Sequence, residues 1–119
     1  MPAPKVLVVD DEPAVLRLVS NALSARGYQV QAASGPVQAL DIVKAAPCFD
    51  LVLSDVIMPE MCGPELVRKI AQLCPDAAIV LMSAYVAAEA LPEHAAFIGK
   101  PFHIADLYSV VEKKLAPQS

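Results

Sequence analysis

The sequence predicts an α/β fold in which helices cover both faces of a five-stranded parallel sheet. Strand-like and helix-like segments alternate five times along 119 residues, which is typical of a doubly wound sheet with right-handed crossovers. Several strand segments are unbroken apolar runs, so both of their faces should be buried. The length is that of one domain, and we expect residues 1–119 to form a single domain.

The expected strands are short segments rich in β-branched and aliphatic residues. They cover residues 5–9, 28–33, 51–54, 78–82 and 97–99. The segment 28–33 alternates only weakly, which suits an edge strand. Pro59 keeps the third strand from continuing far past Asp55. We expect this carboxylate at the strand tip to be exposed, because an unpaired buried charge is costly.

Apolar residues recur at helical spacing between and after these strands. The first helix begins at Pro13, which a first helical turn tolerates, and Gly27 provides its stop. Three further helices are expected after residues 34–36, over 65–73 and over 104–115. The expected inward-facing residues are Val37, Leu40 and Val43 in the second helix and Leu66, Ile70 and Leu73 in the third. The apolar residues are Val15, Leu16, Val19, Ala22 and Leu23 in the first helix, where they recur at helical spacing, and Leu107, Val110, Val111 and Leu115 in the last.

Composition argues against several classes of protein. The net charge is −4 at pH 7 and no basic stripe is present, which disfavours direct nucleic-acid binding. No apolar run approaches the length of a membrane span, and the first residues are too few for a signal peptide, so we expect a cytoplasmic protein without membrane contact. Cys48, Cys62 and Cys74 form no CxxC motif and are expected to be reduced thiols.

Polar side chains follow four of the five expected strands. They are Asp10 and Asp11 after the first, Asp55 after the third, Ser83 after the fourth and Lys100 after the fifth. The carboxyl ends of parallel strands meet at one edge of the sheet, so these residues should converge. Clustered carboxylates repel, and a hard cation such as Mg²⁺ relieves this while leaving a position for a phosphoryl oxygen. A carboxylate in such a site, with a lysine nearby, is suited to attack phosphorus and become an aspartyl phosphate.

Each of these residues alone has an ordinary structural explanation. An acidic pair before a helix complements the helix dipole, a serine after a strand commonly forms a turn, and a lysine before proline is commonly solvated. Their joint placement on four strand ends favours a functional site.

The chain resembles a response-regulator receiver domain of bacterial two-component signalling over essentially its full length. The motifs that carry the resemblance are Val8-Val9-Asp10-Asp11-Glu12, Leu53-Ser54-Asp55-Val56-Ile57-Met58-Pro59 with Gly63, Met82-Ser83-Ala84 and Lys100-Pro101-Phe102. The resemblance implies a flavodoxin-like sheet with strand order 2-1-3-4-5. It also implies a cis peptide bond before Pro101.

By this resemblance, Asp55 accepts the phosphoryl group and Mg²⁺ is the cofactor, held by Asp10, Asp11, Asp55 and the backbone carbonyl of Ile57. A histidine kinase or a phosphotransfer domain supplies the group from phosphohistidine. The phosphorylated state then shifts a conformational equilibrium at a surface that an unidentified downstream protein reads. The resemblance therefore implies a signalling switch that catalyses only its own phosphorylation and dephosphorylation, and not a turnover enzyme.

Two further residues have roles implied by the resemblance. Ser83 is the hydroxyl switch that turns toward the phosphoryl group, and Lys100 is the ionic partner of that group. Phe97 stands where receivers carry an aromatic switch, which changes rotamer when the hydroxyl residue moves. A simple core aromatic would occupy the same position.

The chain departs from the usual receiver pattern in its fourth helix. Only sixteen residues separate Ser83 from Lys100, fewer than receivers usually have. Residues 87–91 favour a helix but Pro92 disfavours its continuation, so we expect a shortened or irregular fourth helix over 86–95. Because receivers commonly dimerise through a full fourth helix, this protein should be mainly monomeric. We expect residues 1–119 to be a receiver domain alone, without an output domain.

Three alternatives stay open. An aspartate-nucleophile phosphohydrolase of the haloacid-dehalogenase kind usually has a second Asp two residues after the nucleophile, where Ile57 stands. An FMN carrier on the same fold needs a Ser/Thr/Gly-rich loop after the first strand, but residues 10–13 are Asp-Asp-Glu-Pro. A phosphorylation-independent interaction module would not need the acidic trio and Lys100.

Overall fold

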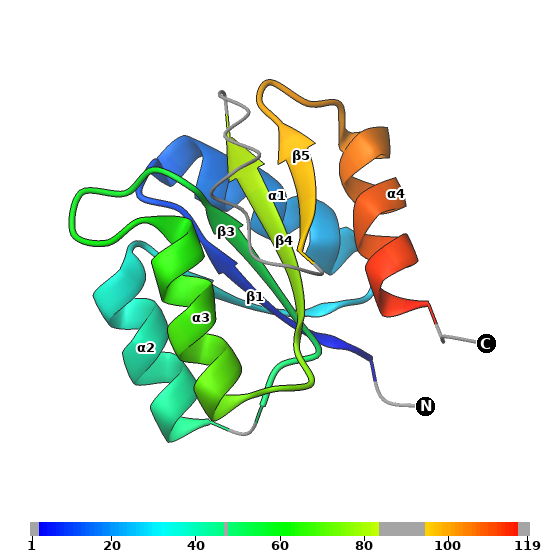
Figure 1. Ribbon diagram of the computed structural model, residues 1–119. Helices are drawn as coiled ribbons and strands as arrows, with labels where there is room; N and C mark the ends of the chain where they lie inside the picture. The colour runs from blue at the N-terminus through cyan, green and yellow to red at the C-terminus, as the bar shows by residue number, and fades with distance from the viewer. Residues whose placement is uncertain (1–2, 47, 84–94, 117–119) are drawn as a thin grey trace.

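The computed structural model describes residues 3–46, 48–83 and 95–116. In these residues a five-stranded, all-parallel sheet has the order β2-β1-β3-β4-β5, which confirms the predicted topology (Figure 1). The strands are β1 (Lys5–Val9), β2 (Gln29–Ala33), β3 (Leu51–Asp55), β4 (Ala78–Ser83) and β5 (Ala96–Gly99).

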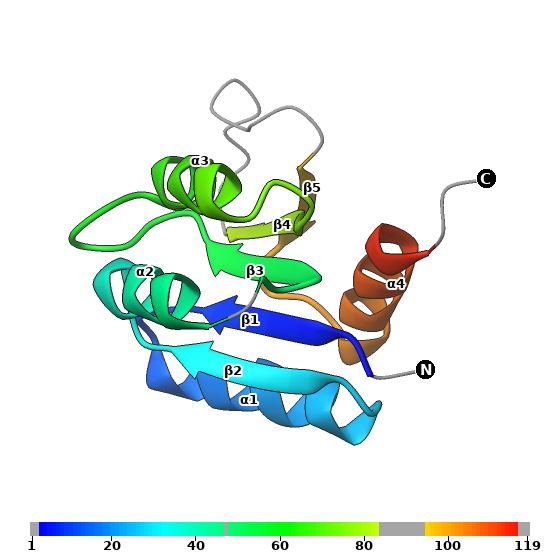
Figure 2. The same ribbon diagram turned by 90° about the horizontal axis from the view of Figure 1, so that it is seen from below.

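Helices cover both faces of the sheet. They are α1 (Pro13–Ala25), α2 (Pro36–Ala45), α3 (Gly63–Leu73) and α4 (Ile104–Leu115). Figure 2 shows α2 and α3 together on one face, with α1 and α4 on the other. None of the helices in the described ranges is long and apolar enough to cross a membrane.

The central strands separate two apolar cores. Along β1, Val6 and Val8 pack on the side of α1 and α4, whereas Leu7 and Val9 pack on the side of α2 and α3. Successive strand side chains point to opposite faces of a sheet. A strand covered on both faces therefore needs the unbroken apolar run that the sequence contains.

Each helix begins and ends where the local sequence favours it. Proline lies in the first two positions of α1, α2 and α3, where its missing N–H costs no intrahelical hydrogen bond. Beyond the end of α1, Gly27 adopts a φ of 89°, a left-handed conformation that favours glycine. The last helix has the predicted bounds, and the cis peptide bond between Lys100 and Pro101 is present as predicted.

Two residues predicted to face inward lie on the surface. Val37 is 54% exposed because α2 buries Pro36, Ala39 and Val43, and consecutive helical residues point about 100° apart. Leu73 is 45% exposed because α3 ends there, and Cys74 is buried in its place.

The bounds of five elements also differ from the prediction by one or two residues. Strands β3 and β4 each end one residue later than expected, at Asp55 and Ser83, and β5 begins one residue earlier, at Ala96. Helix α3 begins at Gly63, two residues before the expected start, and β2 begins at Gln29, one residue later than expected. The prediction of a shortened fourth helix falls on residues 84–94, outside the described part of the chain.

Candidate functional site

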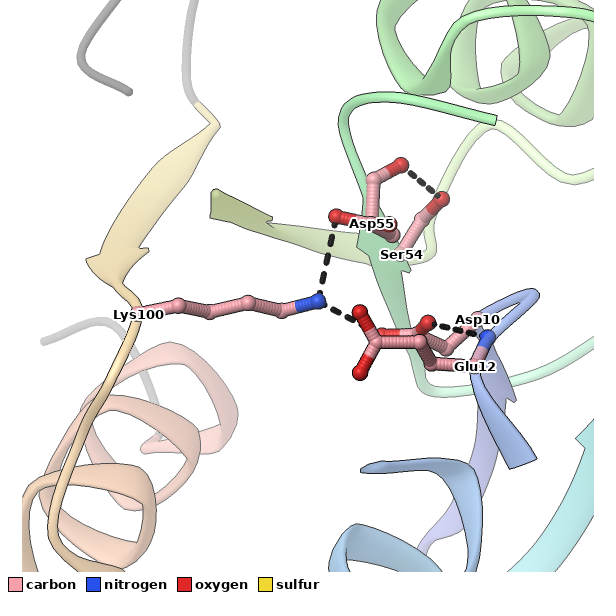
Figure 3. A network of polar contacts seen from close by, with 5 residues as sticks. All are labelled: Asp10, Glu12, Ser54, Asp55 and Lys100. Carbon is pink, nitrogen blue, oxygen red and sulfur yellow. Dashed lines mark hydrogen bonds and ion pairs between the residues drawn. The ribbon is translucent and has the colours of Figure 1, made fainter. Parts of the chain in front are cut away.

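The carboxyl edge of the sheet brings four charged side chains together, as the sequence predicted. Asp10 and Asp11 follow β1, Asp55 ends β3, and Lys100 follows β5. One carboxylate oxygen from each aspartate lies within 4.8 Å of the others. Lys100 reaches the same point, with its Nζ 2.9 Å from Asp10 Oδ2 and 3.3 Å from Asp55 Oδ1 (Figure 3).

Asp10 is fully buried and both of its carboxylate oxygens have partners. The backbone N–H of Glu12 donates to Oδ1 over 2.9 Å, and the Lys100 ammonium donates to Oδ2. The first of these hydrogen bonds joins residues two apart and closes a local turn, which leads the chain from β1 into α1. Asp10 therefore orients the chain as well as contributing charge.

Asp55 is buried, and the expectation that it would be exposed was wrong. The residue is 8% exposed, and Lys100 arrives from β5 to offset its charge. Burial raises the pKa of the Asp55 carboxyl, and the negative charge of Asp10 raises it further, while Lys100 lowers it only in part. Asp55 thus lies in a crowded acidic site, where a bound cation would stabilise the charged carboxylate.

Lys100 is held in place by its backbone as well as by the carboxylates. Its N–H donates to the carbonyl of Ser83 over 2.8 Å, which continues the pairing of β5 with β4. Burial lowers the pKa of its ammonium, but the hydrogen bond and charge of Asp10, together with Asp55, raise the pKa by more. Lys100 is therefore charged at neutral pH.

The loop after β3 returns closely to the strand end. The N–H of Gly63 donates to the carbonyl of Val56 over 2.7 Å. A Cβ on Gly63 would collide with the backbone carbonyl oxygen of Asp55 and would lie 2.9 Å from Val56 Cα. Gly63 was predicted as a motif residue at a helix start, but this close approach was not predicted, because it depends on the path of the whole loop.

Ser54 is a second supporting residue that the sequence analysis missed. Its buried hydroxyl donates to the backbone carbonyl of Asp55 over 2.9 Å, as Figure 3 shows. A serine in an otherwise apolar strand, directly before the candidate aspartate, was the available signal. Directly after β3, the N–H of Val56 donates to the carbonyl of Met82 in β4 over 2.9 Å. This hydrogen bond extends the pairing of the two strands one residue past Asp55.

The remaining predicted site residues are Ser83, Phe97 and Ile57. Ser83 ends β4, is 2% exposed and pairs in register with Gly99 of β5. Phe97 is partly buried and packs against the core under α2 and α3. Ile57 lies in the loop after β3 with 59% of its surface exposed. None of these three residues has a charged side chain.

The donor set fits a hard divalent cation. Asp10, Asp11 and Asp55 offer carboxylate oxygens, which are the ligands that Mg²⁺ and Ca²⁺ prefer. Asp11 is exposed, so one side of the cluster is open to water and to a ligand. A partly open acidic site beside a lysine, at the carboxyl edge of a doubly wound sheet, defines a class of protein that handles a phosphoryl group with a divalent cation.

The chain belongs to the response regulator receiver domain family, whose model matches residues 6–112. It is 40% identical over 119 residues to the sensor kinase CckA of Brucella abortus, of which it spans 13%. It is 32% identical over 116 residues to the response regulator receiver protein CpdR of the same organism, covering 93% of this chain and 96% of CpdR. The sporulation initiation phosphotransferase F of Bacillus subtilis is 32% identical over 121 residues, with 97% of this chain and 96% of that protein covered.

Solved structures of receivers have the same fold. The receiver domain of the hybrid histidine kinase CckA superposes with a TM-score of 0.84 at 34% identity, over 94% of this chain and 99% of that one. Chemotaxis protein CheY4 of Vibrio cholerae gives 0.86 at 28% identity, over 95% and 99%. The protein is a phosphorelay signalling switch of the receiver type.

Proposed function

We propose that Asp55 is the phosphoacceptor of this receiver and that Mg²⁺ occupies the acidic cluster. The observation that carries the proposal is the convergence of Asp55 with Asp10, Asp11 and Lys100 at one strand edge. A carboxylate oxygen of Asp55 attacks phosphorus, the bond from phosphorus to the donor's histidine nitrogen breaks, and the imidazole leaves. Bound Mg²⁺ supplies charge neutralisation for the phosphoryl oxygens, with the backbone carbonyl of Ile57 as a further ligand.

Lys100 and Ser83 complete the proposed machinery. Lys100, already 3.3 Å from Asp55 Oδ1, pairs with the phosphoryl group once the carboxylate has become an acyl phosphate. Ser83 turns its hydroxyl toward that group, and Phe97 follows by changing rotamer. The support for this coupling is that β4 and β5 are in register here, with Ser83 opposite Gly99 and Leu81 opposite Phe97.

The acceptor assignment is tested with acetyl phosphate and Mg²⁺, followed by mass spectrometry of the intact protein. The unmodified sequence should gain one phosphoryl group, Asp55→Asn should gain none, and chelation of the cation should abolish labelling. Asp41→Asn removes an exposed carboxylate on α2 and should label normally. Undiminished labelling of Asp55→Asn would overturn the assignment.

We further propose that the phosphodonor, a histidine kinase or a phosphotransfer domain, docks over α1. A groove of about 370 Å³ lies beside Lys100, lined by Glu12, Val15, Leu18, Lys100, Pro101 and Phe102. Leu18 is 52% exposed on its rim. A donor must bring phosphorus to Asp55, so it must cover the neighbouring surface, and this groove offers apolar contact there.

The docking surface is separable from the chemistry. Leu18→Asp should slow phosphotransfer from a protein donor while leaving labelling by acetyl phosphate unchanged. Val37→Asp places the same charge at an equally exposed position on α2 and is the matched control. Equal transfer rates for the two variants would contradict docking over α1.

A further inference from the structure

Two of the three cysteines lie side by side at the amino edge of the sheet, away from the acidic cluster. Cys48 comes shortly before β3, and Cys74 follows α3. The Cys48 thiol donates to the carbonyl of Leu73 over 3.6 Å, and the Cys74 thiol donates to the carbonyl of Phe49 over 3.7 Å. Each sulfur thus reaches the residue adjacent to the other cysteine, and this reciprocal pattern places the two sulfurs next to each other.

The electrostatics of Cys74 agree with this contact. Burial raises the pKa of its thiol, and a hydrogen bond and charge interaction with Cys48 raise it further, to about 11. Both thiols are free in the structure. The two cysteines are therefore interacting partners in the reduced protein.

The backbone fixes this proximity. The N–H of Ala78 donates to the carbonyl of Asp50 over 3.0 Å, where the pairing of β3 with β4 begins. On the helix side, the N–H of Cys74 donates to the carbonyl of Ile70 over 2.7 Å, and its own carbonyl accepts from Ala77. Both cysteines therefore lie next to the same hydrogen-bonded strand pair, and their closeness is a property of the fold.

The two thiols differ in access, and the third cysteine is remote. Cys48 is exposed, whereas Cys74 is 1% exposed. A dissolved reagent therefore meets Cys48 first, and Cys74 is reached through it. Cys62 lies at the opposite end of α3 from Cys74, and the 11 helical residues between them separate the two positions by about 18 Å. Disulfide geometry requires Cα atoms closer than about 7 Å, so Cys62 is excluded as a partner of Cys74 in the folded protein.

We propose that Cys48 and Cys74 form a reversible redox pair, which a small disulfide such as oxidised glutathione closes into an intramolecular disulfide. The Cys48 thiolate attacks the oxidant, whose S–S bond breaks, and one glutathione thiolate leaves. The Cys74 thiol then gives up its proton and its sulfur attacks the Cys48 sulfur. The mixed disulfide breaks, and the second glutathione leaves and takes up a proton. The protein loses two electrons and two protons, which the oxidant gains as it becomes two molecules of reduced glutathione.

The closed bridge would join the segment before β3 to the end of α3. The ring it closes contains both β3 and α3, and so constrains the unfolded chain over that whole stretch. The acidic cluster lies at the other edge of the sheet and is left intact. Oxidation should therefore raise the melting temperature by about 5 °C or more, without removing the capacity of the protein to take a phosphoryl group.

The test uses Cys62→Ser, because trypsin cleavage after Lys44 and Arg68 leaves Cys48 and Cys62 in one peptide. This variant is treated with oxidised glutathione, its remaining thiols are alkylated, and it is analysed by mass spectrometry. The expected product has lost two hydrogen atoms, carries neither glutathione nor an alkyl group, and yields peptide 45–68 linked to the peptide that contains Cys74.

Two further variants separate the roles of the thiols. With Cys74→Ala added, a stable glutathione adduct should remain on Cys48. With Cys48→Ser added, Cys74 should take neither glutathione nor the alkylating reagent until the protein is unfolded. Circular dichroism verifies that each variant is folded, and Cys48→Ser changes only an exposed side chain.

Two results would overturn the proposal. One is a stable glutathione adduct on Cys48 while Cys74 is present and remains a thiol. The other is an oxidised protein whose only disulfides join two copies of the chain.

Discussion

Replacing Asp55 with asparagine should stabilise the protein when no divalent cation is present. The Asp55 carboxyl is 8% exposed and lies within 4.8 Å of oxygens from Asp10 and Asp11. Like charges at that distance repel by about 3.5 kcal/mol each at an effective dielectric constant of 20. Attraction to Lys100 at 3.3 Å is about 5 kcal/mol on the same basis. The repulsion of Asp55 by Asp10 and Asp11, together with the cost of burying its charge, exceeds its attraction to Lys100.

The net gain is smaller than these opposing energies, because Asp11 is exposed and solvent screens its charge. We expect Asp55→Asn to raise the free energy of unfolding by about 1 kcal/mol, or the melting temperature by about 4 °C.

The gain should depend on pH in a defined direction. Burial and, second, the charge of Asp10 raise the pKa of the Asp55 carboxyl in the folded state above its ordinary value of 3.8. The folded protein therefore binds this proton more tightly than the unfolded chain does. The destabilisation by ionised Asp55 is fully present above the raised pKa and disappears as pH falls toward 3.8. The advantage of asparagine should be largest at neutral pH and absent in acid.

Thermal unfolding followed by circular dichroism, in a chelating buffer from pH 4 to pH 8, measures this difference. Asp41→Asn, an exposed carboxylate on α2, should change stability by less than about 0.5 kcal/mol at any pH. A lower melting temperature for Asp55→Asn at neutral pH would refute the reasoning, because it would mean that the ion pair with Lys100 outweighs the repulsion.

Three further predictions concern the surroundings of the site. Lys100→Met should lower the free energy of unfolding by about 2–3 kcal/mol, because it leaves buried carboxylates unpaired. In denaturant titrations, adding Asp55→Asn to this variant should restore part of the lost stability. If it restored none, the loss would come from packing and not from the unpaired charge. Gly63→Ala should lower the free energy of unfolding by about 2 kcal/mol, because its Cβ would collide with the end of β3. The Cβ of Gly35→Ala would meet only a side chain, at 3.9 Å, so this control should be nearly neutral. Equal losses of stability in thermal melts of the two variants would contradict the close approach at Gly63. Ile57→Asn should shorten the lifetime of the phosphorylated protein, because a polar side chain near the acceptor can orient water; an unchanged decay rate by mass spectrometry would mean that water access at this position is not limiting.

The sequence by itself determined the sheet and the meeting of the charged residues. Unbroken apolar runs such as 78–82 require burial on both faces, which in an alternating chain means parallel strands between two layers of helices. Parallel strands place all their carboxyl ends on one edge, so the convergence of Asp10, Asp55 and Lys100 followed from topology alone. Each of these predictions depends on a local pattern and one general rule of chain geometry.

Only the tertiary structure decided how the residues are surrounded. Asp55 is buried because Lys100 arrives from a distant strand and makes burial tolerable, which no local pattern reveals. Val37 is exposed because its neighbours in α2, not its own hydrophobicity, fix which face of the helix meets the sheet. Cys48 and Cys74 become neighbours because β3 and β4 pair in one particular register. Burial and contact are properties of several segments at once, so they are set by packing and not by any single stretch of sequence.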